Sequence, residues 1–354
     1  MKKERIILTS IILVLIFSLA GCKPAEKKQV IVYAAGSLII PFDAIAKAFE
    51  AEHPDIQVVA EYHGSIQVMR QVTDIHIPVD VVATADQALI PMLMYAQNDP
   101  DTGKPFATWS VKFATNKLAL AYNPNSKYAD EITSDNWYKI ISRPDVKLGF
   151  ADPRFDAVGY RTLMAIKLAE KEYSQQGLLY HLLDKQFTYP ILQDSDTGIS
   201  LIRVPEVLET TPGAHIVLRG ASIQAIALLE SGDIDYAFEY ESVIKQHNLK
   251  MIALPDEINL GNPDFRKNYQ GVEVRMDFQR FATVVPDFVG DVISYGITIP
   301  ANAPDPVEAA EFINYILGPE GKEIMKSYFH PLLDPIVPDH CDLMPKSLQV
   351  YCGK

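Results

Sequence analysis

The stretch Val30-Ile-Val-Tyr-Ala-Ala-Gly-Ser37-Leu38 decides the fold of this chain. It reads as an apolar strand that runs through a Gly-Ser turn into a helix. In that helix Phe42, Ile45 and Phe49 recur at the spacing of one face. Pro41 lies in the first helical turn, where a missing backbone N–H breaks no hydrogen bond. The stretch therefore predicts a strand–turn–helix unit.

A second unit of the same kind follows, with a strand over residues 56–60, the turn Tyr62-His63-Gly64-Ser65 and another helix. Two such turns, each with a hydroxyl and free backbone N–H groups, can converge on one small anion without a Lys or Arg. A single Gly-Ser turn is explained equally well by a plain N-cap. Because two occur on the first two strands, we interpret Ser37 and Ser65 as candidate ligand residues.

The rest of the chain alternates strand and helix patterns. Further strands are expected over residues 79–83, 113–122, 147–150, 216–218, 234–240 and 292–299. Helices are expected from about Val158 and over Pro306–Leu317, and Asp86 is expected to cap a helix. This alternation predicts an α/β fold with largely parallel sheets. The late strand and helix need a sheet to join, and the N-terminal sheet is the natural host.

The length of the chain suggests two lobes. We expect residues 1–21 to form a signal peptide and 22–29 a lipid-anchored tether. Lobe 1 is expected over 30–112, lobe 2 over 113–298, and a return to lobe 1 with a C-terminal tail over 299–354. The chain would then cross between the lobes near residue 113 and again near residue 298.

The N-terminus carries the features of a targeting segment. Lys2, Lys3 and Arg5 precede a mainly apolar run over residues 6–20, which is short for a membrane span and suited to a signal peptide. The run ends in Leu19-Ala20-Gly21-Cys22, which resembles a lipobox, in which Cys22 would carry diacylglycerol after cleavage. An ordinary signal peptide with a chance cysteine is the alternative. We expect an extracytoplasmic protein anchored to the outer face of the cell membrane.

The composition limits the partners. Removal of residues 1–21 takes away three positive charges and one negative charge, so the formal charge goes from −13 to −15. An acidic chain is a poor candidate for binding nucleic acid. It also has no long-range attraction for anions, so an anion site must depend on local geometry.

Besides Cys22, the chain has only Cys341 and Cys352, both in its last 14 residues. In an oxidising compartment we expect them to form a disulfide rather than a metal site, because no His or Cys cluster surrounds them. The histidines show no metal-ligand spacing, and the motifs of nucleotide-binding and hydrolytic enzymes are absent from the sequence. We therefore expect no enzyme and no cofactor.

The chain resembles the solute-binding proteins of ABC importers, in the molybdate/tungstate-binding family (the ModA and WtpA type), and most closely the archaeal-type WtpA branch. The resemblance covers about residues 30–330. The matching segments are Ala34-Ala35-Gly36-Ser37-Leu38, Tyr62-His63-Gly64-Ser65, residues 79–86, residues 113–122, Gly159-Tyr160-Arg161, residues 228–242 and residues 295–300. The family implies a two-lobed periplasmic-binding-protein-like fold (type II), with two mostly parallel-stranded lobes, a two-stranded hinge and the ligand between the lobes.

The resemblance also implies a ligand set. Ser37 and Ser65 would bind the oxyanion from lobe 1, and the backbone N–H groups of Val158 and Ser222 would bind it from lobe 2. Two carboxylates, Asp156 and Glu239, would reach the metal itself. From this role we expect replacement of either serine to weaken binding with little loss of fold.

Some residues leave alternatives open. Glu241 competes with Glu239, because both would alternate onto one face of an extended strand. Asp156 could instead be the N-cap of the following helix, and Glu239 could lie at a solvated strand end or in a salt bridge. We expect Arg161 to be a structural partner of such an acid rather than a ligand.

The chain departs from the family pattern in two places. Asp156-Ala157 stands where Asp-Pro is common, and extra residues lie between Gln193 and Arg219.

Two carboxylates in an anion site would repel sulfate or phosphate. Mo(VI) and W(VI) are large Lewis acids that can expand from four oxygens to six, so the acids could bond the metal and discriminate against the abundant anions. The sequence thus predicts a monomeric receptor that captures tungstate or molybdate and delivers it to a membrane permease and its ATPase subunit. The alternatives are a receptor for another oxyanion or ferric ion on the same scaffold, or a lipid-anchored hydrolase.

Overall fold

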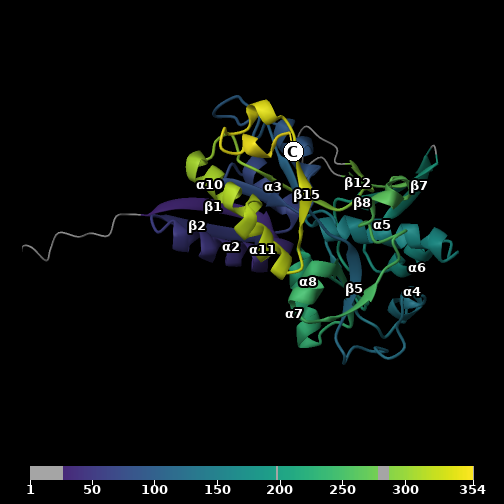
Figure 1. The fold of residues 1–354 in the computed structure, drawn as a ribbon. Helices are drawn as coiled ribbons and strands as arrows, with labels where there is room; N and C mark the ends of the chain where they lie inside the picture. Colours follow the sequence, from purple (N-terminus) through teal and green to yellow (C-terminus); the bar gives the residue numbers. More distant parts are fainter. Residues whose placement is uncertain (1–26, 197, 278–286, 354) are drawn as a thin grey trace, which may run out of the picture.

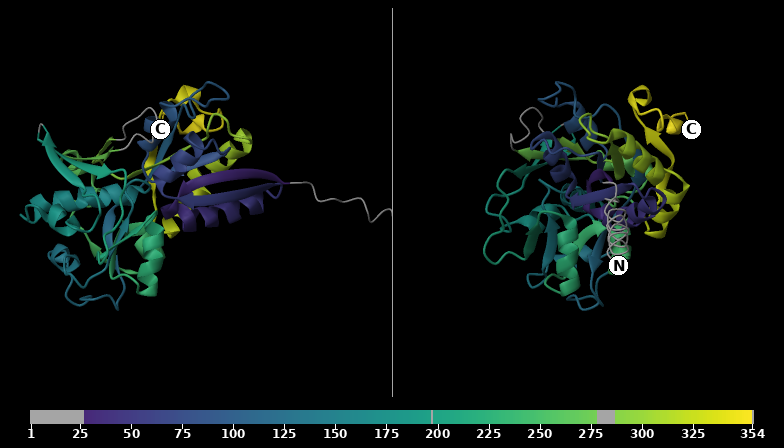
Figure 2. Two further views of the ribbon diagram at one scale, coloured as in Figure 1. Left: turned by 180° about the vertical axis from the view of Figure 1, so that it is seen from behind. Right: turned by 90° about the vertical axis from the view of Figure 1, so that its left-hand side faces the viewer.

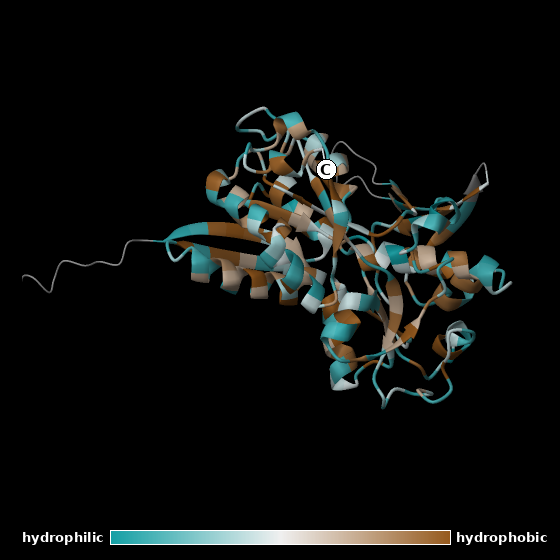
Figure 3. Cartoon of the chain, in the orientation of Figure 1, coloured by the Kyte–Doolittle hydropathy of each residue, from teal (hydrophilic) through white to brown (hydrophobic). Residues whose placement is uncertain are grey.

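The structure, a computed structural model, describes residues 27–353 except residue 197 and residues 278–286. Its strands form three sheets, and the two larger sheets are the centres of two lobes that lie side by side (Figures 1 and 2). Hydrophobic residues gather on the strands and along one side of the helices (Figure 3), and their side chains form the buried core. In the first helix the buried face carries Phe42, Ile45 and Phe49, as the sequence predicted.

Lobe 1 contains a six-stranded sheet of order β15-β4-β14-β3-β1-β2. Its strands are β1 (Lys28–Ala35), β2 (Ile56–His63), β3 (Val81–Thr84), β4 (Val111–Thr115), β14 (Ser294–Thr298) and β15 (Leu332–Pro338). Its helices are η1 (Gly36–Leu38), α2 (Ile39–Glu52), α3 (Ser65–Thr73), η2 (Ile90–Tyr95), α10 (Pro306–Leu317) and α11 (Pro319–Ser327). β1 pairs in parallel with β2 and β3, whereas β14 and β15 join antiparallel.

Lobe 2 contains a five-stranded sheet of order β11-β5-β10-β6-β9. Its strands are β5 (Leu118–Tyr122), β6 (Leu148–Ala151), β9 (Ile216–Arg219), β10 (Tyr236–Tyr240) and β11 (Lys250–Ala253). Its helices are α4 (Trp137–Ile141), α5 (Ala157–Glu172), α6 (Leu178–Leu183), α7 (Ser222–Ser231) and α8 (Glu241–Gln246), followed by η3 (Pro263–Phe265) and α9 (Arg266–Tyr269). β10 is parallel to β6 and antiparallel to β5, so both lobe sheets are mixed rather than mostly parallel.

Lobe 2 is shorter at both ends than predicted, because the chain enters it later than residue 113 and leaves it before residue 298. The single strand expected over residues 113–122 is two strands, because β4 ends in the lobe 1 sheet and β5 begins in the lobe 2 sheet. The apolar run is interrupted only by Asn116-Lys117, where the chain crosses. β14 also belongs to lobe 1, so the return precedes Ser294 instead of following residue 298. β4 and β14, adjacent and antiparallel, are the two strands of the hinge.

A third sheet of four strands, in the order β13-β12-β8-β7, was not predicted. Its strands are β7 (Leu192–Asp196), β8 (Ile199–Pro205), β12 (Val272–Asp277) and β13 (Asp287–Val289). The extra residues after Gln193 thus build a hairpin, and β8 of that hairpin pairs in parallel with β12. The Phe288 ring of β13 stacks on the Tyr160 ring of α5 at 4.3 Å, which attaches this sheet to lobe 2.

A disulfide joins Cys341 and Cys352 in the tail, the pair expected from the sequence. The tail contains two short helical turns, η4 (Cys341–Leu343) and η5 (Gln349–Tyr351). Met344 and Leu348, between the two cysteines, are buried, so this loop is packed onto the protein. Its anchoring explains why a chain end can be ordered without a strand or helix of any length.

The proposed signal peptide, Cys22 and most of the tether lie outside the described residues. Within the part of the chain that the structure describes, no helix combines the length and the apolar character needed to cross a membrane.

Candidate functional site

The two Gly-Ser turns lie next to each other at one edge of lobe 1. β1 and β2 pair in parallel with Ala35 opposite His63, so Gly36-Ser37 and Gly64-Ser65 follow at neighbouring strand ends. Ser37 lies in η1 and Ser65 is the first residue of α3, and both are buried. Because the carboxyl ends of parallel strands meet at one sheet edge, the two serines reach the same region, as predicted.

Both glycines allow lobe 2 to approach closely. A Cβ on Gly64 would lie 2.3 Å from the carbonyl oxygen of Phe155, and one on Gly36 would lie 3.2 Å from the Ile223 side chain. Phe155 precedes α5 and Ile223 lies in α7, so each turn faces the N-terminus of a lobe 2 helix. Gly64 is needed because no side chain fits at that distance.

The N-terminus of α3 donates directly to lobe 2. The backbone N–H groups of Ile66 and Gln67 donate to the Phe155 carbonyl at 3.0 and 3.2 Å. These are among the helix N-terminal groups that lack a partner within their own helix. The two lobes are therefore joined across the site by hydrogen bonds from main chain to main chain.

The serine hydroxyls have partners within the protein. Ser65 Oγ accepts a 3.0 Å hydrogen bond from the Ala85 N–H, and Ser37 Oγ lies 2.9 Å from the Tyr295 hydroxyl. Tyr295, on β14 of the hinge, also accepts from the Asn116 amide at 3.3 Å. Sequence reasoning gave Tyr295 no role, although Tyr295-Gly296 lies in one of the matching segments.

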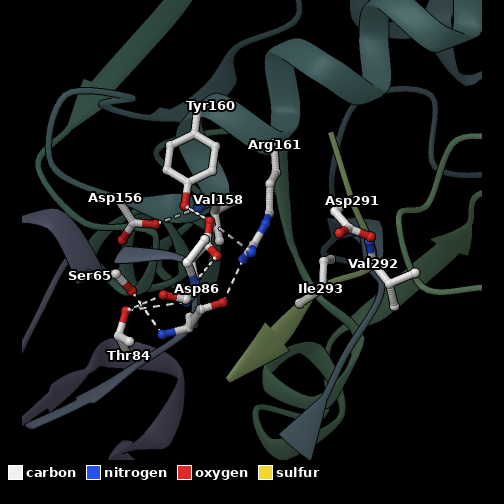
Figure 4. A network of polar contacts seen from close by, with 12 residues as sticks. Ser65, Thr84, Asp86, Asp156, Val158, Tyr160, Arg161, Asp291, Val292 and Ile293 are labelled. Atoms are coloured by element: carbon white, nitrogen blue, oxygen red, sulfur yellow. Dashed lines mark hydrogen bonds and ion pairs between the residues drawn. The ribbon is translucent and has the colours of Figure 1, made fainter. Parts of the chain in front are cut away.

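Asp156 occupies the two lobe 2 donors that the sequence assigned to the ligand. Its Oδ1 accepts from the Val158 N–H at 2.7 Å, and its Oδ2 accepts from the Ser222 N–H at 3.0 Å (Figure 4 shows Asp156 and Val158). Burial raises the pKa of Asp156 to about 6, and the two N–H bonds oppose that rise. Asp156 is thus the N-cap of α5, the alternative left open above, and it also links the start of α5 to that of α7.

Glu239 carries an oxygen that has no partner. The side chain is 1% exposed, Oε1 accepts from the Tyr240 N–H at 2.7 Å, and Oε2 is buried without a hydrogen bond to any described residue. Burial, with a contribution from the charge of Asp156, raises the pKa of Glu239 to about 8, and the Tyr240 N–H and the nearby Ser222 hydroxyl oppose that rise. A buried carboxylate oxygen without a donor is costly unless it is protonated or meets a ligand.

The structure separates Glu239 from Glu241. β10 ends at Tyr240 and Glu241 begins α8, so the two acids do not share a strand face. Glu241 pairs with Lys245 and lies 3.5 Å from Lys117 Nζ. The surroundings of Glu241 are those of a surface ion pair, and Glu239 is the acid that lies within the site.

Arg161 pairs with a different acid from the one expected. Its Nη2 lies 3.3 Å from Asp86 Oδ2 of lobe 1, and its Nη1 donates to the Ala85 carbonyl at 2.7 Å and to the Tyr240 hydroxyl. Tyr160 also donates to Asp86 Oδ2 at 2.6 Å (Figure 4). The prediction that Asp86 caps a helix is wrong, because η2 begins at Ile90 with Leu89 at its N-cap. Asp86 instead accepts from the Ala88 N–H at 3.0 Å in the preceding turn, and its second oxygen faces lobe 2. No local pattern in the sequence indicates this pairing.

The site can offer oxygen ligands without being a resident metal centre. Among the described residues, no group of three or more His, Cys, Asp or Glu side chains could hold a metal ion. Asp156 and Glu239 are therefore two carboxylates among hydroxyl and N–H donors.

Two α/β lobes that meet through facing helix N-termini define a solute-binding protein of the type II class. Residues 30–329 match the family described as bacterial extracellular solute-binding protein, and the chain belongs to this family. It is 37% identical over 347 residues to an uncharacterized solute-binding protein of Staphylothermus marinus, covering 95% of this chain and 94% of that one. A solute-binding protein of Methanoculleus marisnigri is 37% identical over 314 residues, covering 89% and 83%.

Solved structures share the fold. A periplasmic molybdate-binding protein of Azotobacter vinelandii superposes with a TM-score of 0.55 at 16% identity, covering 86% of this chain and 99% of that one. A sulfate-binding protein of Mycobacterium tuberculosis gives a TM-score of 0.55 at 14% identity, covering 87% and 88%. At these identities the likeness concerns the fold alone. The chain is a solute-binding protein of an ABC transporter, and its solute is a separate question.

Proposed function

We propose that this protein captures tungstate or molybdate between its two lobes and delivers it to the permease of an ABC importer. The observation that carries the proposal is the pairing of Asp156 and Glu239. Asp156 lies on the Val158 and Ser222 N–H groups, and Glu239 keeps one buried oxygen free beside it. Ser222 connects the two acids, because its N–H donates to Asp156 and its hydroxyl lowers the pKa of Glu239, while the charge of Asp156 raises that pKa.

An oxyanion would exchange partners with Asp156. Its oxygens would accept from the Val158 and Ser222 N–H groups, which carry the positive ends of two helix dipoles. Ser37 and Ser65 would add hydroxyls from lobe 1. The Asp156 carboxylate, displaced from its donors, would then bond the metal together with Glu239.

This exchange favours tungstate and molybdate over sulfate and phosphate. Six-coordination requires a metal that accepts two more oxygens, which sulfur and phosphorus do not readily do. Sulfate or phosphate at the same place would meet the charged Asp156 carboxylate with no bond to compensate the repulsion. Glu239, with a pKa of about 8, would add to this repulsion only once it has lost its proton. Burial raises the pKa of Asp156, and the buried Arg161 guanidinium opposes that rise and so favours the charged carboxylate.

Two buried tyrosines near the acids make ferric ion the main competing solute. Tyr240 and Tyr295 are buried with their rings 6.0 Å apart, close to the two acids, and ferric sites use tyrosines beside carboxylates. However, burial raises the pKa of Tyr240 well above its ordinary value, whereas iron ligation needs the phenolate. The Tyr240 hydroxyl also accepts from Arg161, which holds it away from a metal role.

The remaining parts of the proposal concern location and partners. Cleavage before Cys22 and lipidation of its thiol would anchor a monomer at the outer face of the membrane, near the permease and its ATPase subunit. The protein would act as a receptor without catalysis. Mass spectrometry of the mature protein tests the anchor, with a diacylglycerol-modified Cys22 as the expected N-terminus. An unmodified chain that begins elsewhere would contradict it.

Thermal unfolding with added anions tests the solute. Micromolar tungstate or molybdate should raise the melting temperature, because a ligand that binds only the folded state stabilises it by mass action. Sulfate, phosphate and ferric citrate at the same concentration should leave the melting temperature unchanged. A shift with sulfate, phosphate or iron and none with tungstate or molybdate would contradict the proposed function.

A further inference from the structure

Direct bonds between the lobes meet at one acid of lobe 1. Asp86 follows β3, whereas Tyr160 and Arg161 lie in the first turns of α5 in lobe 2. Figure 4 shows both side chains reaching from α5 to Asp86, with the Tyr160 hydroxyl at 2.6 Å and Arg161 Nη2 at 3.3 Å from Oδ2. Arg161 adds a 2.7 Å bond to the Ala85 carbonyl, so lobe 1 contributes both a charge and a main-chain acceptor.

These contacts are shielded from solvent. The side chains of Arg161 and Asp86 are 5% and 14% exposed, and Tyr160 is fully buried. Charge-assisted hydrogen bonds of this kind are stronger than neutral ones and are weakened little by salt when buried. Separation of the lobes would break every bond between Asp86 or Ala85 and α5 in one step.

We propose that Asp86, Tyr160 and Arg161 form an inter-lobe latch, a set of positioning residues that holds the lobes together and sets how long the solute stays bound. None of the three belongs to the ligand set. They act on it through Tyr240, because Arg161 donates to the Tyr240 hydroxyl and the Tyr240 N–H donates to Glu239 Oε1. The latch therefore connects lobe closure to the placement of Glu239.

The effect on binding follows from population arithmetic. If only the closed form binds tightly, the apparent dissociation constant rises as the closed fraction falls. Since the latch bonds exist only in the closed form, weakening them should speed solute release while the ligand groups stay intact. Discrimination between tungstate and sulfate should not change, because it depends on the acids at the metal. The solute in this argument rests on the proposed function, whereas the latch itself does not.

Two variants test the latch with matched chemistry. Asp86→Asn keeps the size of the side chain and its bond from the Ala88 N–H, but removes the charge that Arg161 faces. Tyr160→Phe removes only the hydroxyl and keeps the ring that stacks on Phe288. The control is Glu131→Gln, which removes an ion pair with Arg143 that lies wholly within lobe 2.

Small-angle X-ray scattering of the ligand-free proteins measures whether the latch holds the lobes together. Asp86→Asn should increase the radius of gyration relative to the parent, Tyr160→Phe should increase it less, and Glu131→Gln should leave it unchanged. Stopped-flow release of tungstate should be about tenfold faster in Asp86→Asn, the effect of losing one charge-assisted bond. The ratio of tungstate to sulfate affinity should stay that of the parent.

An unchanged radius in both latch variants would overturn the proposal, even if their melting temperatures fell, because a merely structural role would lower stability without opening the lobes. Unchanged tungstate release in both variants would overturn the link to solute retention. If the parent bound neither tungstate nor molybdate, the proposed function would fail, and the scattering comparison would still decide whether the latch exists.

Discussion

The carboxylate of Asp156 accepts a 3.0 Å hydrogen bond from the backbone N–H of Ser222 and so connects the first turns of α5 and α7. With the Val158 N–H on its other oxygen, Asp156 occupies both lobe 2 donors expected to hold the oxyanion. An arriving anion and the side chain therefore compete for the same N–H groups. Displacement of the acid by the ligand would free its oxygens for the metal.

Replacement of Asp156 by asparagine tests this exchange. Asparagine caps helices nearly as well as aspartate, so α5 should form. Its amide nitrogen cannot accept from the Ser222 N–H, so the variant should also lose about 1–3 kcal/mol of stability. Tungstate affinity should fall by more than tenfold, about 1.4 kcal/mol, because a charged metal ligand is lost. Sulfate, relieved of repulsion, should bind no worse. Isothermal titration calorimetry measures both affinities.

Glu241→Gln is the matched control for the acids, because Glu241 pairs with Lys245 outside the site. Its tungstate affinity should equal that of the parent. Normal binding by Asp156→Asn would contradict the exchange. Loss of binding in Glu241→Gln with none in Glu239→Gln would transfer the ligand role to Glu241.

Replacement of the two serines by alanine should lower the stability of the fold by different amounts. Ser65→Ala leaves the Ala85 N–H without its acceptor and should reduce the free energy of unfolding by about 1–3 kcal/mol. Ser37→Ala should cost less, about 1 kcal/mol, because Tyr295 keeps its bond to Asn116. The expectation that both would spare the fold is therefore revised for Ser65. Denaturant unfolding measures the difference, and equal stability of the two variants would contradict it.

The raised pKa of Glu239 predicts a pH dependence of stability. Its pKa is about 8 in the folded protein against 4.5 ordinarily, because burial disfavours the charged form. The folded state then holds more protons than the unfolded state between these values, so this group's contribution to stability falls as the pH rises from about 4.5 to about 8. The ligand-free Glu239→Gln variant should lack that contribution.

Unfolding of the ligand-free parent and of Glu239→Gln at several pH values checks this sign. The stability of the parent relative to the variant should decrease steadily toward pH 8. A relative stability that increases with pH would mean that Glu239 is charged in the folded protein throughout this range.

The disulfide between Cys341 and Cys352 should stabilise the tail alone. It closes a short loop and connects no strands of either lobe sheet, so its effect on the unfolded chain is local. Reduction should speed hydrogen exchange around the buried Met344 and Leu348 and leave the exchange of β1 unchanged. A thiol count of two in the unreduced, unfolded mature protein would contradict the disulfide.

Local patterns predicted the parts of the fold that depend on local chemistry. Apolar runs followed by Gly-Ser gave β1 and β2 with their helices, and the helix Pro306–Leu317 has the predicted bounds. The crossing at Asn116-Lys117 escaped detection because β4 and β5 are both apolar strands and only two polar residues separate them. The third sheet was missed because β8 pairs with β12, a partner far along the chain.

The sequence selected residues that lie together in the structure but did not predict the contacts between them, and their role in ligand binding stays a prediction. Spacing and resemblance selected Ser37, Ser65, Asp156 and Glu239, and the structure brings them to the region where the lobes meet. The bond from Tyr160 to Asp86 joins residues 74 positions apart, and no periodicity encodes such a pair. Burial, which separates Glu239 from Glu241, depends on where β10 ends and is likewise decided by the fold.

X-ray absorption spectroscopy of the tungstate complex tests the central claim most directly. The parent protein should show six-coordinate tungsten with two W–O distances longer than the rest, contributed by Asp156 and Glu239. Both long distances should be lost in the Asp156→Asn, Glu239→Gln double variant, while the Glu241→Gln control should give the spectrum of the parent. A purely tetrahedral tungstate spectrum in the parent complex would contradict the account.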